Sequence, residues 1–243
     1  MTHMHIPDGI LPVGLWILGF LIMSIFMGIS LLRLRGSDLK KKVPLLGALS
    51  AAMLVAMSLE IVPIAYHINL SVVAGILLGP ALGYLAAFIT NLMLALMGHG
   101  GITVMGLNTL LLGTEVVVGH TLFYALPKRL PVLWRAAAAT VLTLFFTTLV
   151  LIGIVAASNV EPEFFHHAQE HAGEEHAAEV HGAHHEDVIS VSRFATMALS
   201  LGFFGWLIEA AVTGSVIKFI ARVKPELLRH VLHREKAAQE GTR

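Results

Sequence analysis

Residues 70–97 read LSVVAGILLGPALGYLAAFITNLMLALM, an apolar stretch that is interrupted by Gly79 and Pro80. Proline cannot continue a helix normally, and the residue before a proline avoids helical backbone. The first arm, 70–78, is too short for a full membrane crossing, which takes about 20 residues. We therefore predict a broken element packed against other helices, because irregular backbone at membrane depth is tolerated only where protein covers it.

The whole chain has the composition of a membrane protein. Of its 243 residues, 56% are hydrophobic and 13% are charged, and its mean hydropathy is +0.78. Soluble domains carry about 25% charged residues. Further apolar stretches are long enough to span a membrane, at 10–32, 43–64, 102–126, 132–156 and 194–221. With the broken stretch 70–97, the sequence predicts an all-α, polytopic helical membrane protein with about seven transmembrane helical elements.

Clusters of Lys and Arg predict the topology. They lie at 33–42, at 128–135 and in the tail from 222 onward, and such clusters favour the cytoplasm. All three clusters fall on one side only if 70–97 crosses twice or re-enters. We therefore expect a multi-pass protein of the inner (plasma) membrane, with its N-terminus outside and its C-terminus in the cytoplasm.

Several function classes are excluded by residues that the sequence lacks. There is no cysteine, so a bound metal must use nitrogen and oxygen ligands. No Gly is followed by Lys, so the chain has no phosphate-binding loop of the G-x-x-x-x-G-K-[ST] type. Neither a nucleophile–base arrangement nor an H-E-x-x-H motif is present. The chain is not expected to be an enzyme, and energy for uphill transport would come from another subunit or a gradient.

A few ionisable residues lie near or within the predicted spans. Intramembrane carboxylates suggest function by default. Glu60 is near a helix end, where its carboxylate reaches water easily, and we expect a structural role. Glu115 and Glu209 lie deeper, and function and hydrogen bonding between helices stay open for both. His120 is expected to be a hydrogen-bonded core histidine.

Residues 159–187 differ from the rest of the chain. They hold seven of the fourteen histidines and eight of the sixteen acidic residues. Imidazole binds Ni, Co, Cu and Zn, and carboxylates assist. Because the spacing is irregular, we predict an extracytoplasmic loop that collects metal with low specificity, rather than a plain acidic linker. Its histidines are His166, His167, His171, His176, His181, His184 and His185.

Small residues four apart share one helix face in the span 43–64. This face, formed by Gly47, Ala48, Ala51 and Ala52, permits close approach of another helix. Spacing alone leaves two readings open, which are packing within the chain and docking of a partner helix.

Three blocks of the sequence together resemble a known family. They are MHIPDG at 4–9, His67 followed by Gly79-Pro80, and HGGITVMGLNT at 99–109. The combination closely resembles the substrate-binding membrane subunit of cobalt/nickel energy-coupling-factor ABC transporters, the CbiM/NikM family. The resemblance covers roughly residues 4–222, and the His-rich loop and the tail lie outside the shared pattern.

That resemblance implies a subunit that captures Ni²⁺ or Co²⁺ outside the cell, with no organic cofactor. Its partners would be a transmembrane coupling subunit and cytoplasmic ABC ATPases, often with a small accessory membrane subunit. The metal would be held by the N-terminal amine, by the amide nitrogen and imidazole of the second residue, and by a further His. These correspond to Met4, His5 and His67 in this sequence.

Such a ligand set is chemically consistent. Amine, deprotonated amide and imidazole form fused chelate rings, and a second imidazole completes a planar set of four nitrogens, which suits Ni(II) or Cu(II). Protons must leave for the metal to bind, so affinity should fall as the pH falls. Three extra residues precede Met4, and Thr2 with His3 could form the same chelate instead. His99 and Asn108, in the third block, either orient the His67 loop or stabilise a Gly-rich turn.

The sequence thus predicts three parts: an N-terminal metal-chelating segment 1–9, a transmembrane domain 10–222 and a basic cytoplasmic tail 223–243. The favoured function is metal capture for an ATP-driven importer. A stand-alone secondary metal carrier, with Glu115 and Glu209 along the path, and a membrane metal sensor remain as alternatives. The sequence does not choose between nickel and cobalt.

Overall fold

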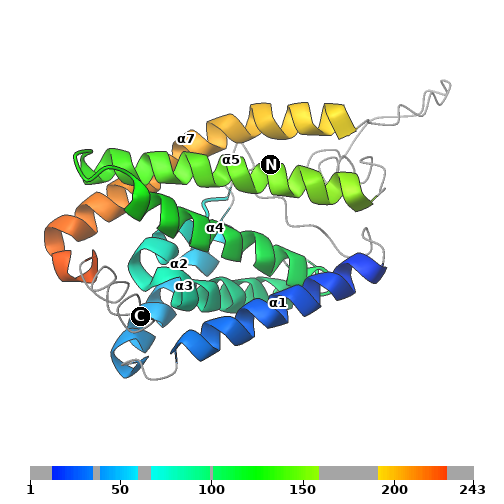
Figure 1. Ribbon diagram of the computed structural model, residues 1–243, viewed down its shortest axis with the longest axis horizontal. Helices are drawn as coiled ribbons and strands as arrows, with labels where there is room; N and C mark the ends of the chain where they lie inside the picture. The colour runs from blue at the N-terminus through cyan, green and yellow to red at the C-terminus, as the bar shows by residue number, and fades with distance from the viewer. Residues whose placement is uncertain (1–12, 35–38, 60–66, 99–100, 159–190, 229–243) are drawn as a thin grey trace, which may run out of the picture.

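The structure is a computed structural model that describes residues 13–34, 39–59, 67–98, 101–158 and 191–228. These residues form six helices of 20 residues or more and no strand, so the all-α prediction is confirmed (Figure 1). The helices are α1 (Val13–Leu34), α2 (Leu39–Ser58), α3 (Ser71–Leu96), α4 (Met105–Ala125), α5 (Val132–Ser158) and α7 (Val191–Val223). Counting the two arms of α3 separately gives seven helical segments, the predicted number.

Most boundaries fall close to the predicted spans, and α2 differs most. It begins at Leu39 rather than Val43 and ends at Ser58 rather than Ile64. Its first turn therefore includes lysines, which apolar composition alone assigned to the preceding loop. Among the described residues, four helices are long and apolar enough to cross a membrane: Val13–Leu34, Ser71–Leu96, Val132–Ala156 and Ala198–Val223.

The break in α3 is confirmed. Gly79 has φ 78° and ψ 174°, which is not helical, and Pro80 follows it. A side chain at position 79 would be strained at this positive φ, whereas Gly adopts it freely. The first arm is buried at every position from Ser71 to Gly79. The short arm is thus covered by protein, as its length required.

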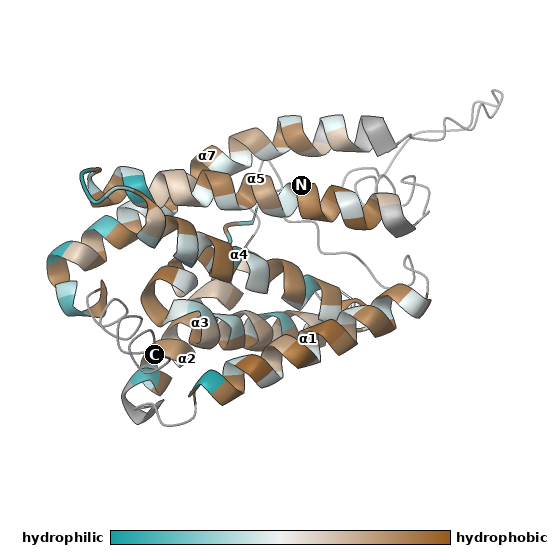
Figure 2. Cartoon of the chain, in the orientation of Figure 1, coloured by the Kyte–Doolittle hydropathy of each residue, from teal (hydrophilic) through white to brown (hydrophobic). Residues whose placement is uncertain are grey.

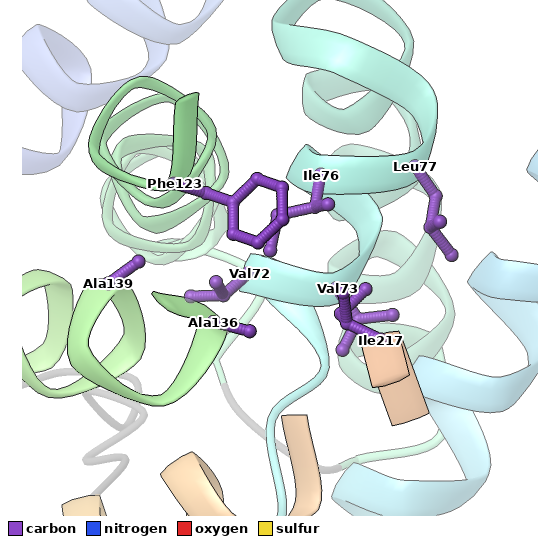
Figure 3. Close-up of a cluster of buried hydrophobic side chains, with 8 residues drawn as sticks. All are labelled: Val72, Val73, Ile76, Leu77, Phe123, Ala136, Ala139 and Ile217. Carbon is purple, nitrogen blue, oxygen red and sulfur yellow. The ribbon is translucent and has the colours of Figure 1, made fainter. Parts of the chain in front are cut away.

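Close approach of α3 and α4 forms the centre of the bundle. A Cβ added at Gly75 would lie 2.3 Å from the carbonyl oxygen of Val116, and one added at Gly113 would lie 2.3 Å from the ring of Tyr84. Helices α5 and α7 pack along each other, and α1 crosses α4 (Figure 1). Four of these helices share an apolar core, shown in Figure 3: Val72, Val73, Ile76, Leu77, Phe123, Ala136, Ala139 and Ile217.

Hydrophobic residues predominate along the helices, and strongly hydrophilic ones gather mainly at the left end of the view (Figure 2). Large exposed hydrophobic residues lie on every helix, as expected for a surface that faces lipid. The end of α1, the start of α2, the α4–α5 connection and the end of α7 lie together at one end of the bundle, at the left of Figure 1. The basic clusters of the described residues thus share one end, as predicted, and the side of the membrane that this end faces stays a prediction.

The crossing of α1 and α4 should depend on Gly106. A Cβ added there would meet backbone atoms, at 2.6 Å from the nitrogen of Phe20 and 2.7 Å from the carbonyl carbon of Gly19. Because backbone cannot move aside as a side chain does, we expect Gly106→Ala to lower stability by about 1–3 kcal/mol. Thermal unfolding in detergent measures this. Gly153→Ala is the matched control, since its Cβ would meet nothing within 4 Å. Equal stability of both variants would contradict the close crossing.

Candidate metal-binding segment

The predicted ligands are only partly within the described residues. His67 and Asn108 are described. The N-terminal candidates Thr2, His3, Met4 and His5, together with Glu60, His99 and the His-rich loop, lie outside. Within the described part of the chain, no three His, Asp or Glu side chains gather in a way that could hold a metal. A metal bound at His67 would therefore need ligands from elsewhere, which is the role assigned to the N-terminal segment.

His67 lies on a short non-helical segment, 67–70, that leads directly into the first arm of α3. Its side chain is half-buried. Two residues further, Asn69 is fully buried, and its Oδ1 accepts a hydrogen bond of 2.8 Å from the backbone N–H of Ser71 and another from the Ser71 hydroxyl. An Asn that accepts from the N–H two residues on is a common way to start a helix. Leu70 is the N-cap residue of α3, so these bonds form a turn just ahead of the helix and direct how the chain enters it.

Glu115 holds the same segment from α4. Its Oε2 accepts a hydrogen bond from Asn69 Nδ2, and its Oε1 accepts one of 3.3 Å from the hydroxyl of Thr147 on α5. The carboxylate is buried. Within the described residues, Glu115 thus makes hydrogen bonds between helices, and one of its partners is two residues from His67.

Sequence reasoning did not single out Asn69, Ser71 or Thr147. The order Asn-x-Ser ahead of an apolar run is typical of a turn that leads into a helix and could have identified this contact. Its link to Glu115 and Thr147 could not be found in this way, because the contact depends on how α4 and α5 are rotated against α3.

The start of α4 is fixed by a second polar contact. Asn91, on the second arm of α3, donates 2.9 Å hydrogen bonds to the carbonyl oxygen of Met105 and to the hydroxyl of Thr109. Asn108 lies buried in the same first turns. It stands seven residues before Glu115, so both lie on one face of α4. The described part of the third sequence block, 101–109, is therefore anchored to α3. The supporting role of Asn108 stays a prediction.

His120 and Glu209 both lie inside the bundle. His120 Nδ1 is 2.9 Å from the carbonyl oxygen of Gly75, and its ring lies 4.7 Å from that of Tyr124. The prediction of a bonded core histidine is confirmed. Glu209, on α7, is fully buried. Burial within the bundle keeps its carboxyl group away from lipid.

The small-residue face of α2 is exposed. Gly47, Ala48, Ala51 and Ala52 all have exposed positions, and a Cβ added at Gly47 would meet nothing within 4 Å. The opposite face, with Leu46 and Met53, is buried against α3. Among the described residues, the small-residue face is therefore not used for packing within the chain.

Comparison with known proteins agrees with this architecture. Residues 5–227 match the CbiM family, described as the cobalt uptake substrate-specific transmembrane region. A fused nickel transport protein, NikMN, of Archaeoglobus fulgidus is 29% identical over 231 residues, which is 93% of this chain and 68% of the relative. A cobalt transport protein, CbiM, of Methanococcus voltae is 33% identical over 138 residues, covering 54% of this chain and 62% of the relative.

Two solved crystal structures share the fold. One, described as a transition metal transporter, has a TM-score of 0.70 at 21% identity and covers 95% of this chain and 97% of that one. Another, a truncated transition metal transporter, has a TM-score of 0.69 at 18% identity and covers 90% and 99%. Since the family match extends over nearly the whole chain, this protein belongs to the CbiM family of cobalt uptake substrate-specific transmembrane proteins.

Proposed function

We propose that this chain is the substrate-capture subunit of an ATP-driven energy-coupling-factor importer for Ni²⁺ or Co²⁺. The observation that carries the proposal is the placement of His67 on a segment anchored inside the bundle, at the start of a broken helix, in a member of this family. Transporters commonly bind substrate beside such discontinuous helices. The names of the relatives, which mention nickel and cobalt, support this class of substrate.

The metal site we propose consists of four nitrogens. They are the N-terminal amine, the amide nitrogen and imidazole of His5, and the imidazole of His67, with Met4 supplying the amine. Thr2 and His3 would supply an equivalent chelate if the mature chain began at Thr2. Mass spectrometry of the active protein distinguishes the two starts. Planar nitrogen ligation favours Ni(II) over Zn²⁺, which prefers a tetrahedron, and over Mg²⁺ and Ca²⁺, which prefer oxygen.

The energy source in this proposal is a set of partner subunits. A transmembrane coupling subunit would contact this chain, and cytoplasmic ABC ATPases would hydrolyse ATP. The absence of a phosphate-binding loop from the sequence supports this division of labour. Metal uptake by cells should therefore stop when the co-expressed ATPase is inactivated. Uptake that persists would favour a secondary carrier instead, and metal binding without any transport would favour a sensor.

Removing His67 should separate the selective site from the metal-collecting loop. His67→Ala takes away one of four ligands, and we expect high-affinity Ni²⁺ and Co²⁺ binding to be lost. Deleting 159–187 should leave that affinity intact and only slow capture at scarce metal, because the loop is proposed to collect metal rather than to select it. Titration of the purified protein with each metal measures both. Equal losses from the two changes would place the loop within the selective site.

The exposed face of α2 should serve assembly rather than metal binding. We expect Ala51→Leu to hinder close approach of a partner helix and so to reduce recovery of the complex with the coupling subunit, with Ni²⁺ affinity unchanged. Co-purification of the subunits measures assembly. Ala156→Leu is the control, because that alanine is exposed on α5, away from this face. Normal assembly of the Ala51→Leu protein would count against the docking role.

A further inference from the structure

The contacts behind the His67 segment form a short chain of buried polar groups across three elements. Asn69 stands on the segment itself, Glu115 on α4 and Thr147 on α5, and all three are buried. The membrane interior makes such groups costly unless they are hydrogen-bonded. The hydrogen bonds among these groups therefore decide how the segment is held.

The orientation of the Asn69 amide is determined by its neighbours. Its oxygen accepts from the backbone N–H of Ser71, and its NH₂ group donates to Glu115. An amide turned the other way would direct its NH₂ at an N–H donor and its oxygen at a carboxylate. Only in this orientation can the Asn69 amide accept from Ser71 at the start of α3 and donate to Glu115 on α4 at the same time.

Glu115 accepts from two sides. Its two oxygens receive the amide of Asn69 and the hydroxyl of Thr147, and that hydroxyl also lies 3.2 Å from the carbonyl oxygen of Leu144. The carboxylate thus links the segment before α3 to α5. A shift of the segment would break a buried hydrogen bond, which resists the shift.

We propose that Glu115 is the positioning residue of the metal-binding segment, holding Asn69 so that the His67 imidazole stands ready for the metal. This inference rests on the proposed function. Only Ile68 separates His67 from the anchored Asn69, so an anchor at Asn69 restricts where the imidazole can lie. A ligand whose segment is already ordered binds metal more tightly than one that must be ordered on binding. Ligand positions matter on a scale of about 0.5 Å.

Two substitutions of Glu115 test this. In Glu115→Gln, the new amide oxygen can accept the hydrogen bond from Asn69, and the new NH₂ group can donate to the hydroxyl oxygen of Thr147. The Thr147 hydroxyl can then donate to the carbonyl oxygen of Leu144, so all the hydrogen bonds of the network can still form. We expect Ni²⁺ affinity within about threefold of the unchanged protein. Glu115→Leu has a similar size and no hydrogen-bonding group. We expect it to weaken Ni²⁺ binding by at least about tenfold.

The measurement is a titration of the purified full-length protein with Ni²⁺ that yields both the dissociation constant and the number of sites per chain. A positioning role raises the dissociation constant while the number of sites stays the same. A loss of folding alone lowers the number of sites and leaves the dissociation constant unchanged. That second result would overturn the proposal, and so would a loss in Glu115→Leu that Glu115→Gln shares in full.

Matched variants complete the experiment. Asn69→Ala should weaken binding at least as much as Glu115→Leu, because it also removes the bonds from Ser71. The double variant should bind no more weakly than Asn69→Ala alone, because the contact with Glu115 is already lost there. Thr143→Val is the control: this buried hydroxyl lies one turn before Thr147 on α5 and bonds within its own helix, at 2.7 Å to Ala139. It should leave Ni²⁺ affinity unchanged, and a loss equal to that of Glu115→Leu would overturn the proposal.

The role of His67 is tested in the same series. If His67→Ala abolishes high-affinity binding while Glu115→Leu leaves it unchanged, only the positioning role is wrong. If His67→Ala itself leaves high-affinity binding unchanged, the proposed metal site is wrong and the positioning role is wrong with it.

Discussion

A helix that is broken at membrane depth must be covered by protein, and most of this structure follows from that requirement. The first arm of α3 ends at Gly79, where the backbone leaves the helical conformation, and Pro80 brings no N–H group. Water cannot satisfy the freed backbone groups within a bilayer, so neighbouring helices must exclude lipid from them. The consequence is that α3 lies at the centre of the bundle, while α1 remains largely exposed.

Polar side chains fix this central helix to its neighbours. Tyr84 donates to the carbonyl oxygen of Met23 on α1 at 3.4 Å, and Thr90 donates to that of Ser50 on α2 at 3.3 Å. Asn91 and His120 bond α3 to α4. Lipid provides no hydrophobic force between helices, so small residues and hydrogen bonds must hold the bundle together. Each of these contacts has α3 as one partner, and together they hold α1, α2 and α4 against it.

The sequence predicted the parts of this structure that depend on local composition. The lengths of the apolar stretches predicted the helices, and the Gly79–Pro80 pair predicted the break in α3. His120 was correctly expected to be bonded. Glu115 could not be assigned, because its partners are 46 and 32 residues away in the chain. Helix packing determines which face of α4 contacts the segment before α3, and no local sequence pattern predicts that contact.

The break and the proposed metal site have one physical origin. An unbroken helix would begin at the membrane surface, and the residues before it would lie there as well. Because the first arm is short and buried, its N-terminus lies inside the bundle, where its free N–H groups need a partner. Asn69 satisfies one of them and is held in turn by Glu115. The contact that satisfies this N–H group thus also anchors the residues before the helix. His67, the proposed ligand two residues earlier, would gain a restricted position without any contact designed for it alone.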